Sequence, residues 1–171
     1  MGDVIVMVGG NESRGGLAQR TLVYDPARDA WRFGAPIPTE REHLAAVTVG
    51  AELFVLAGRR NSLSTNRTEL EIYDPTADTW RSGPALPTAR GGFDAALLDG
   101  VLYAVGGEQP DRALDSVDAF DVAAGTWSAA PPVPTPRHGH GVVALDGRIW
   151  VVGGADEPIF AAVDALESYA P

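Results

Sequence analysis

The sequence predicts an all-β fold made of repeated four-stranded antiparallel sheets. A tryptophan recurs at Trp31, Trp80 and Trp127, at intervals of 49 and 47 residues. A pair of small residues that ends an apolar run recurs four times, at Gly9-Gly10, Ala57-Gly58, Gly106-Gly107 and Gly153-Gly154. Independent markers that keep one period near 48 residues indicate a series of equivalent units rather than one unique core.

The composition agrees with a folded, turn-rich β protein. Hydrophobic residues make up 45% of the 171 residues and charged residues 21%, which is enough apolar material for a core. Twenty glycines and thirteen prolines without a collagen period indicate many turns. The absence of cysteine excludes disulfides, thiolate metal sites and cysteine nucleophiles. A net charge of −10 argues against a nucleic acid or an anionic membrane as the partner.

The third unit shows the expected strands most clearly. We expect strands over 92–98 and 101–105, joined by Asp99-Gly100, a favoured two-residue hairpin turn. A polar loop over 108–114 leads to a strand over 116–120, and Trp127 opens the fourth strand. The prolines at 131, 132 and 134 end that strand, because proline cannot donate to a β-ladder.

The other units repeat this order. Asp146-Gly147 is equivalent to Asp99-Gly100, and Asp-Pro pairs at 25–26 and 74–75 open the turn between the third and fourth strands. We expect aromatic side chains to fill the space between adjacent sheets. These are Trp31, Trp80 and Trp127, together with Tyr24, Tyr73 and Phe120.

A Pro-Thr-x-Arg string, a Gly-Gly pair, a Tyr-Asp-Pro string and a tryptophan in each period resemble the kelch repeat. The resemblance covers essentially the whole chain and implies a β-propeller, in which each unit is one blade. It implies a partial propeller of about three and a half blades and fourteen strands. We expect an incomplete blade over 1–38, complete blades over 39–87 and 88–134, and an incomplete blade over 135–171.

The terminal units do not complete one another. The first begins at the second strand, and the last stops after the third, whereas kelch propellers commonly close by mixing strands from both ends. Three explanations stay open: a fragment of a longer propeller, a half that assembles with a second copy, or an open arc. In the first blade, the strand over Val4–Val8 lacks its inner neighbour and could accept an extended strand of another chain.

Strand alternation separates two faces. The connections between second and third strands, and the crossovers between units, share one face, which we call the loop face. An arginine recurs there at Arg41, Arg90 and Arg137, and the loop after the second small-residue pair begins with Arg59 and Arg60. In the kelch domains that bind peptides, arginines beside the channel mouth grip acidic side chains, and the resemblance implies that role for the three repeated arginines. The alternative is that each arginine forms a structural ion pair.

His138 and His140 are candidates for a reactive pair. Residues i and i+2 of a strand point the same way, so both imidazoles could face the channel. A metal would need a third ligand, for which His43 and Asp94 are the candidates, and nothing else has ligand spacing. We therefore expect no metal, no cofactor and no catalytic residue.

The sequence favours a non-catalytic scaffold that binds a protein or acidic peptide through the loop face. The predicted ligand-binding residues are Arg41, Arg90, Arg137, His138, His140, Arg59 and Arg60. The alternatives are a carbohydrate-binding or sugar-epimerase-type site at the channel mouth, and a homo-oligomer that completes the propeller. No signal peptide or membrane-spanning run is apparent, and the compartment is left open.

Overall fold

A computed structural model describes residues 4–159 and 161–170, which form four antiparallel sheets of three or four strands and one short two-stranded hairpin. Sheet 1 consists of β1 (Ile5–Met7), β2 (Thr21–Asp25) and β3 (Ala30–Gly34). Sheet 2 consists of β4 (Ala45–Val49), β5 (Glu52–Leu56), β6 (Leu70–Asp74) and β7 (Thr79–Ser82). Sheet 3 consists of β8 (Asp94–Leu98), β9 (Val101–Val105), β12 (Val117–Asp121) and β13 (Thr126–Ala130). Sheet 4 consists of β14 (Gly141–Leu145), β15 (Arg148–Val152) and β16 (Leu166–Tyr169).

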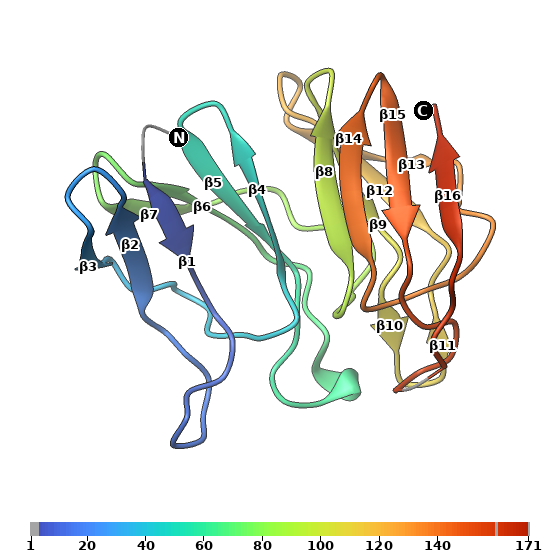
Figure 1. Ribbon diagram of the computed structural model, residues 1–171, viewed down its shortest axis with the longest axis horizontal. Helices are drawn as coiled ribbons and strands as arrows, with labels where there is room; N and C mark the ends of the chain where they lie inside the picture. The colour runs from blue at the N-terminus through green and yellow to red at the C-terminus, as the bar shows by residue number, and fades with distance from the viewer. Residues whose placement is uncertain (1–3, 160, 171) are drawn as a thin grey trace.

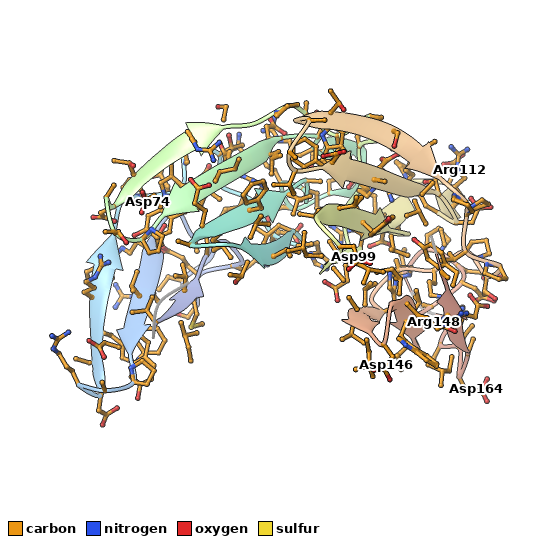
Figure 2. All side chains as sticks on the ribbon, turned by 90° about the horizontal axis from the view of Figure 1, so that it is seen from above. Asp74, Asp99, Arg112, Asp146, Arg148 and Asp164 are labelled. Carbon is orange, nitrogen blue, oxygen red and sulfur yellow. The ribbon has the colours of Figure 1, made fainter. Side chains whose placement is uncertain are left out.

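The sheets stand side by side along an arc (Figure 2). The first strands of sheets 2, 3 and 4, which are β4, β8 and β14, contact one another along the inner side of the arc. In the complete sheets every strand pairs with the strands that precede and follow it within the same sheet. The first strand is therefore innermost and the last strand outermost. This is the radial arrangement of equivalent sheets that the period of about 48 residues predicts. The four sheets contain fourteen strands in the described residues, as expected.

The inner hairpins turn through two residues. Asp99 and Gly100 have φ values of +52° and +82°, and Asp146 and Gly147 have +51° and +69°. Two successive positive φ angles define a turn whose twist matches that of the flanking strands, which explains the Asp-Gly pairs. These hairpins point to the upper edge in Figure 1, opposite the loop face.

The outer turns are fixed by an aspartate that bonds to the backbone two and three residues ahead. Asp25 Oδ1 accepts hydrogen bonds from the amides of Ala27 and Arg28 at 2.9 and 3.2 Å. Asp74 and Asp121 do the same in the next two sheets. An Asx-type turn of this kind needs a short carboxylate side chain, so the aspartate recurs with the period.

The core lies between the sheets and consists mainly of aliphatic side chains, to which aromatic pairs are added. The rings of Tyr73 and Trp80 are 4.9 Å apart, as are those of Phe120 and Trp127. Both tryptophans pack against the neighbouring sheet, which confirms the expectation for them. The expectation is wrong for Trp31, whose residue is 53% exposed, because no sheet covers that side of sheet 1 in the described structure.

The connections on the loop face contain regular secondary structure that the sequence did not indicate. The expected polar loop over 108–114 contains a short hairpin, β10 (Glu108–Gln109) and β11 (Arg112–Ala113). The equivalent connection of sheet 2 contains a 3₁₀ helix, η1 (Leu63–Thr65), whose first turn is capped by Ser62. Both lie at the lower edge in Figure 1.

Candidate functional site

The three repeated arginines lie just before the first strands of sheets 2, 3 and 4. Arg41, Arg90 and Arg137 are each 0% exposed. Each guanidinium pairs with a carboxylate on the third strand of its own sheet. The pairs are Arg41–Glu71, Arg90–Asp118 at 2.7 Å and Arg137–Glu167 at 2.9 Å.

The contacts of Arg90 show what such an arginine does. Its Nη1 donates to the carbonyl oxygens of Gly106 at 2.7 Å and Ser116 at 3.1 Å, and its Nη2 donates to Asp118 Oδ2. Gly106 and Ser116 stand at the two ends of the connection between β9 and β12. The guanidinium therefore ties both ends of a loop to the sheet. Burial lowers the pKa of Arg90, and the adjacent Asp118 carboxylate partly opposes that shift.

The other two arginines bond equivalent carbonyls. Arg41 donates to Ala57 O at 2.6 Å, and Arg137 donates to Gly153 O and Ala165 O, both at 3.1 Å. Ala57 and Gly153 belong to the pairs that recur in the sequence, whereas Ala165 lies just before the third strand of sheet 4. In each of these sheets the arginine thus donates a hydrogen bond to a carbonyl oxygen of the small-residue pair, and this repeated bond fixes the backbone of the loop face.

The structure therefore does not place these arginines where a partner could reach them. The resemblance implied that Arg41, Arg90 and Arg137 line an open channel mouth and grip acidic side chains. All three are fully buried, and their charges are already matched by carboxylates of the same sheet. The geometry corresponds to the alternative of a structural ion pair.

Arg59 joins two neighbouring sheets on the loop face. Its Nε donates to Glu42 Oε1 at 3.1 Å, and its Nη1 donates to Glu108 Oε1 at 2.5 Å. Glu42 precedes β4, whereas Glu108 begins β10 in the connection between β9 and β12 of sheet 3, and both carboxylates are buried. Glu42 also pairs with His43, whose pKa is lowered by burial and next by the Arg59 charge. The network holds the two loops together.

A groove lies between the two structured loops. Its volume is about 290 Å³, and it is lined by Leu63, Ser64, Asn66, Ala89, Gln109 and Pro110. Asn66 Nδ2 donates to Glu108 O at 2.6 Å, and Gln109 Nε2 donates to Ala89 O at 3.2 Å. These bonds connect η1, the β10–β11 hairpin and the crossover before Arg90, so the groove is built from three separate segments.

Arg60 presents its charge to solvent at this face. Its side chain is 47% exposed and donates to Glu40 Oε1 at 2.5 Å. The Glu40 side chain is itself 38% exposed. Between Arg59 and Arg67 the loop carries no acidic residue. Of the predicted ligand-binding residues, Arg60 is the one that the structure leaves accessible.

The two histidines contact different sheets through their Nε2 atoms. His138 Nε2 contacts the Glu157 carbonyl oxygen at 2.9 Å, in the loop of sheet 4. His140 Nε2 contacts Val105 O at 3.2 Å, in sheet 3. Both residues are 8% exposed, and burial lowers the pKa of His140 to about 4, so its imidazole is neutral at pH 7. Their Nε2 atoms thus face different sheets.

Asp94, a candidate third ligand, has another role. Its Oδ2 accepts a hydrogen bond from the Val142 amide at 2.8 Å and thereby links β8 to β14. Burial raises the pKa of Asp94. Within residues 4–159 and 161–170, no group of three or more His, Asp or Glu side chains is arranged to hold a metal ion. No helix of this part of the chain is long and apolar enough to cross a membrane.

The network around Arg59 was missed by sequence reasoning. Glu42 directly follows a repeated arginine, and Glu108 directly follows a small-residue pair, so both hold fixed places in the period. That position was a usable signal for Glu108, because Arg59 follows the previous pair in the same way. The bonds of Asn66 and Gln109 had no such signal, since they depend on loop conformation.

Comparison with known proteins agrees with this architecture. The model of the KLHDC2/KLHL20/DRC7 Kelch-repeats domain matches residues 1–163. No curated protein matches the chain. The chain is therefore a member of the kelch-repeat family, and its four sheets are propeller blades. Kelch domains generally act as protein-interaction scaffolds.

Proposed function

We propose that the chain is a non-catalytic scaffold that binds an acidic segment of a partner protein in the groove between η1 and the β10–β11 hairpin. The observation that carries this proposal is the construction of the groove. Hydrogen bonds from Asn66 and Gln109 hold its walls before any partner arrives. A preformed groove reduces the ordering cost of binding, so a modest contact area can give useful affinity.

Two accessible guanidinium groups supply the preference for acid. Arg60 belongs to the loop that carries η1. Arg112 stands directly opposite Gln109 in the β10–β11 hairpin, so the side chains of Arg112 and Gln109 lie on one face of that hairpin. Figure 2 shows Arg112 at the outer side of the arc. Among residues 4–159 and 161–170, Arg60 pairs with the exposed carboxylate of Glu40, and Arg112 with that of Asp111. Exposed pairs contribute little stability, so an incoming carboxylate can replace the present one.

Buried and half-buried residues support the site without touching the partner. Arg41, Arg90 and Arg137 hold the ends of the loops, and Arg59 joins the loops of sheets 2 and 3. His138 ties the sheet 4 loop through Glu157 O. We assign these five positions a positioning role and Arg60 a contact role.

No described contact favours the alternative of a carbohydrate or epimerase site. That alternative uses Arg90, Arg137, His138 and His140. None of these residues is more than 8% exposed, and the two arginines are 0% exposed. A sugar acid could reach them only after the loops opened.

The test compares two double variants in a binding measurement. The probe is a short fluorescein-labelled peptide of alternating Glu and Gly, followed by anisotropy, and a Gln/Gly peptide serves as the neutral probe. Arg60→Ala/Arg112→Ala removes the two proposed contacts. Arg28→Ala/Arg81→Ala is the matched control, because both arginines are exposed, each pairs with one carboxylate, and neither belongs to the loop face.

We expect Arg60→Ala/Arg112→Ala to weaken binding of the acidic peptide about fivefold to tenfold, and the control to leave it unchanged. The affinity should fall as salt rises from about 50 to 300 mM, because the contacts are exposed to solvent. Equal losses in both double variants would show that the peptide responds only to overall charge. Equal affinity for the acidic and neutral peptides would also contradict the proposal.

A further inference from the structure

Sheet 1 leaves one broad face without a covering sheet. Four large side chains on this face are strongly exposed: Ile5 at 54%, Met7 at 52%, Trp31 at 53% and Phe33 at 64%. The strand register puts them in two rows, with Ile5 in line with Trp31 and Met7 in line with Phe33. The opposite face of sheet 1 is different, because Val23 is 2% exposed and packs with sheet 2. Sheet 1 therefore ends the arc with an apolar surface.

Sheet 4 ends the other side of the arc in the same way. Val143, Leu145, Val152 and Leu166 are 49%, 56%, 49% and 61% exposed. The equivalent positions in sheet 2 are covered by sheet 3 and are buried. Val47, Leu56 and Leu70, the counterparts of Val143, Val152 and Leu166, are 9%, 0% and 1% exposed. A surface of this kind on a folded domain marks an interaction site.

The two uncovered faces carry the two halves of one repeated contact. Within the arc, the central residue of a second strand meets the fourth residue of the next sheet's third strand. Phe54 and Phe120 make this contact with ring centres 6.4 Å apart, and Tyr103 and Tyr169 make it at 6.3 Å. The corresponding residues on the uncovered faces are Trp150 on sheet 4 and Tyr24 on sheet 1. Both are aromatic, as in the Phe54–Phe120 and Tyr103–Tyr169 contacts, whereas the equivalent contact between sheets 1 and 2 joins Val6 and Tyr73.

The repeated tryptophan gives a second, independent sign. Trp80 Nε1 donates to Ala35 O, and Trp127 Nε1 donates to Pro84 O, each at 2.9 Å and each across to the preceding sheet. Trp31 stacks on Tyr24 with ring centres 4.8 Å apart, just as the other two stack on their neighbours. In the described residues no sheet precedes Trp31, and its indole N–H has no acceptor there. The residue is preorganised for a neighbour on that side.

We propose that a second copy of this chain covers these faces, with sheet 4 of each copy packed on sheet 1 of the other. Trp150 of one copy then lies against Tyr24 of its partner, as Phe54 lies against Phe120 within the chain. A contact between two different surfaces is heterologous, so it must close into a ring or grow into a filament. Two copies supply eight sheets, which is within the usual range of about four to eight blades, whereas three copies would exceed it.

The test measures mass in solution for the 171-residue chain and three single variants. Sedimentation equilibrium at about 50 μM chain should give about 36 kDa, twice the 17.9 kDa of one copy. Phe33→Asp alters only the sheet 1 face, and Leu145→Asp alters only the sheet 4 face. Ile159→Asp is the matched control, because Ile159 is 64% exposed but lies in the sheet 4 loop, away from both end faces. Circular dichroism checks that each variant stays folded, as expected for substitutions of exposed side chains.

We expect Phe33→Asp and Leu145→Asp each to weaken association at least about 100-fold, and Ile159→Asp to have no effect. Mixing Phe33→Asp with Leu145→Asp should restore dimers, because the pair contains one contact made of two unaltered faces. A monomeric unaltered chain at this concentration would overturn the proposal. A dimer sensitive to only one of the two faces, or insensitive to both, would also overturn it, as would an assembly larger than two copies.

Discussion

Replacing Arg90 by methionine tests the assignment of the repeated arginines to the framework. Arg90 is 0% exposed, and Asp118, its partner at 2.7 Å, is 5% exposed. Arg90→Met keeps most of the side-chain volume but leaves a buried carboxylate without a counter-charge. Breaking a buried pair in this way costs about 3–5 kcal/mol. We therefore expect the free energy of unfolding to fall by about 4 kcal/mol.

The double variant Arg90→Met/Asp118→Leu separates the charge effect from the other bonds. It removes both charges, so the carboxylate is no longer stranded, and the coupling between the two sites should be about 2 kcal/mol or more. The carbonyls of Gly106 and Ser116 still lose their donor. The double variant should therefore remain about 1–3 kcal/mol less stable than the unaltered chain.

Urea denaturation at pH 7, followed by tryptophan fluorescence, measures these differences. The control is Arg28→Met, because Arg28 is 81% exposed in its side chain and its pair with Asp25 is a surface pair. That variant should stay within about 0.5 kcal/mol of the unaltered chain. The reasoning is refuted if Arg90→Met is equally stable but loses its affinity for an acidic peptide, since Arg90 would then contact the partner directly.

Three further predictions concern the tryptophans, a histidine and a glycine. Trp127→Phe should cost about 1–2 kcal/mol in urea denaturation because it loses a hydrogen bond across sheets, whereas Trp31→Phe in the Phe33→Asp background should cost less than about 0.5. His140 has a folded pKa of about 4, so the free energy of unfolding should fall by up to about 3 kcal/mol as pH drops from 6.5 to 4. Tm should decrease over the same pH range, and it should decrease less in the His140→Asn variant. Gly106→Ala should destabilise strongly, because φ is +61° and the new Cβ would lie 2.5 Å from Arg137 O. Gly141→Ala meets no atom within 4 Å and, in the Leu145→Asp background that keeps the sheet 4 face uncovered, should leave Tm nearly unchanged.

The sequence was informative about the fold because its markers are local and periodic. The Asp-Gly turns, the Asx turns and the order of strands each depend on residues close together in the chain. The same period identified Arg41, Arg90 and Arg137 as one structural position. It could not show whether that position faces solvent, because burial depends on the loop that folds over the guanidinium.

The candidate site was less predictable for the same reason. The groove is formed by η1, the β10–β11 hairpin and the segment before Arg90, and its walls are joined by Asn66 and Gln109. Neither residue repeats along the chain, so periodicity gave no reason to single them out. For Trp31 the periodicity gave a wrong prediction. Its position in the repeat predicted burial, but its exposure depends on whether a neighbouring sheet is present.

Hydrogen exchange at the tryptophan indoles tests most directly whether the sheets are equivalent units stacked side by side. The measurement uses the Phe33→Asp variant, in which the outward face of sheet 1 stays uncovered. We expect slow exchange at Trp80 and Trp127, whose indole N–H groups bond to the preceding sheet, and fast exchange at Trp31. Fast exchange at Trp80 and Trp127, or equal protection of all three, would contradict this arrangement.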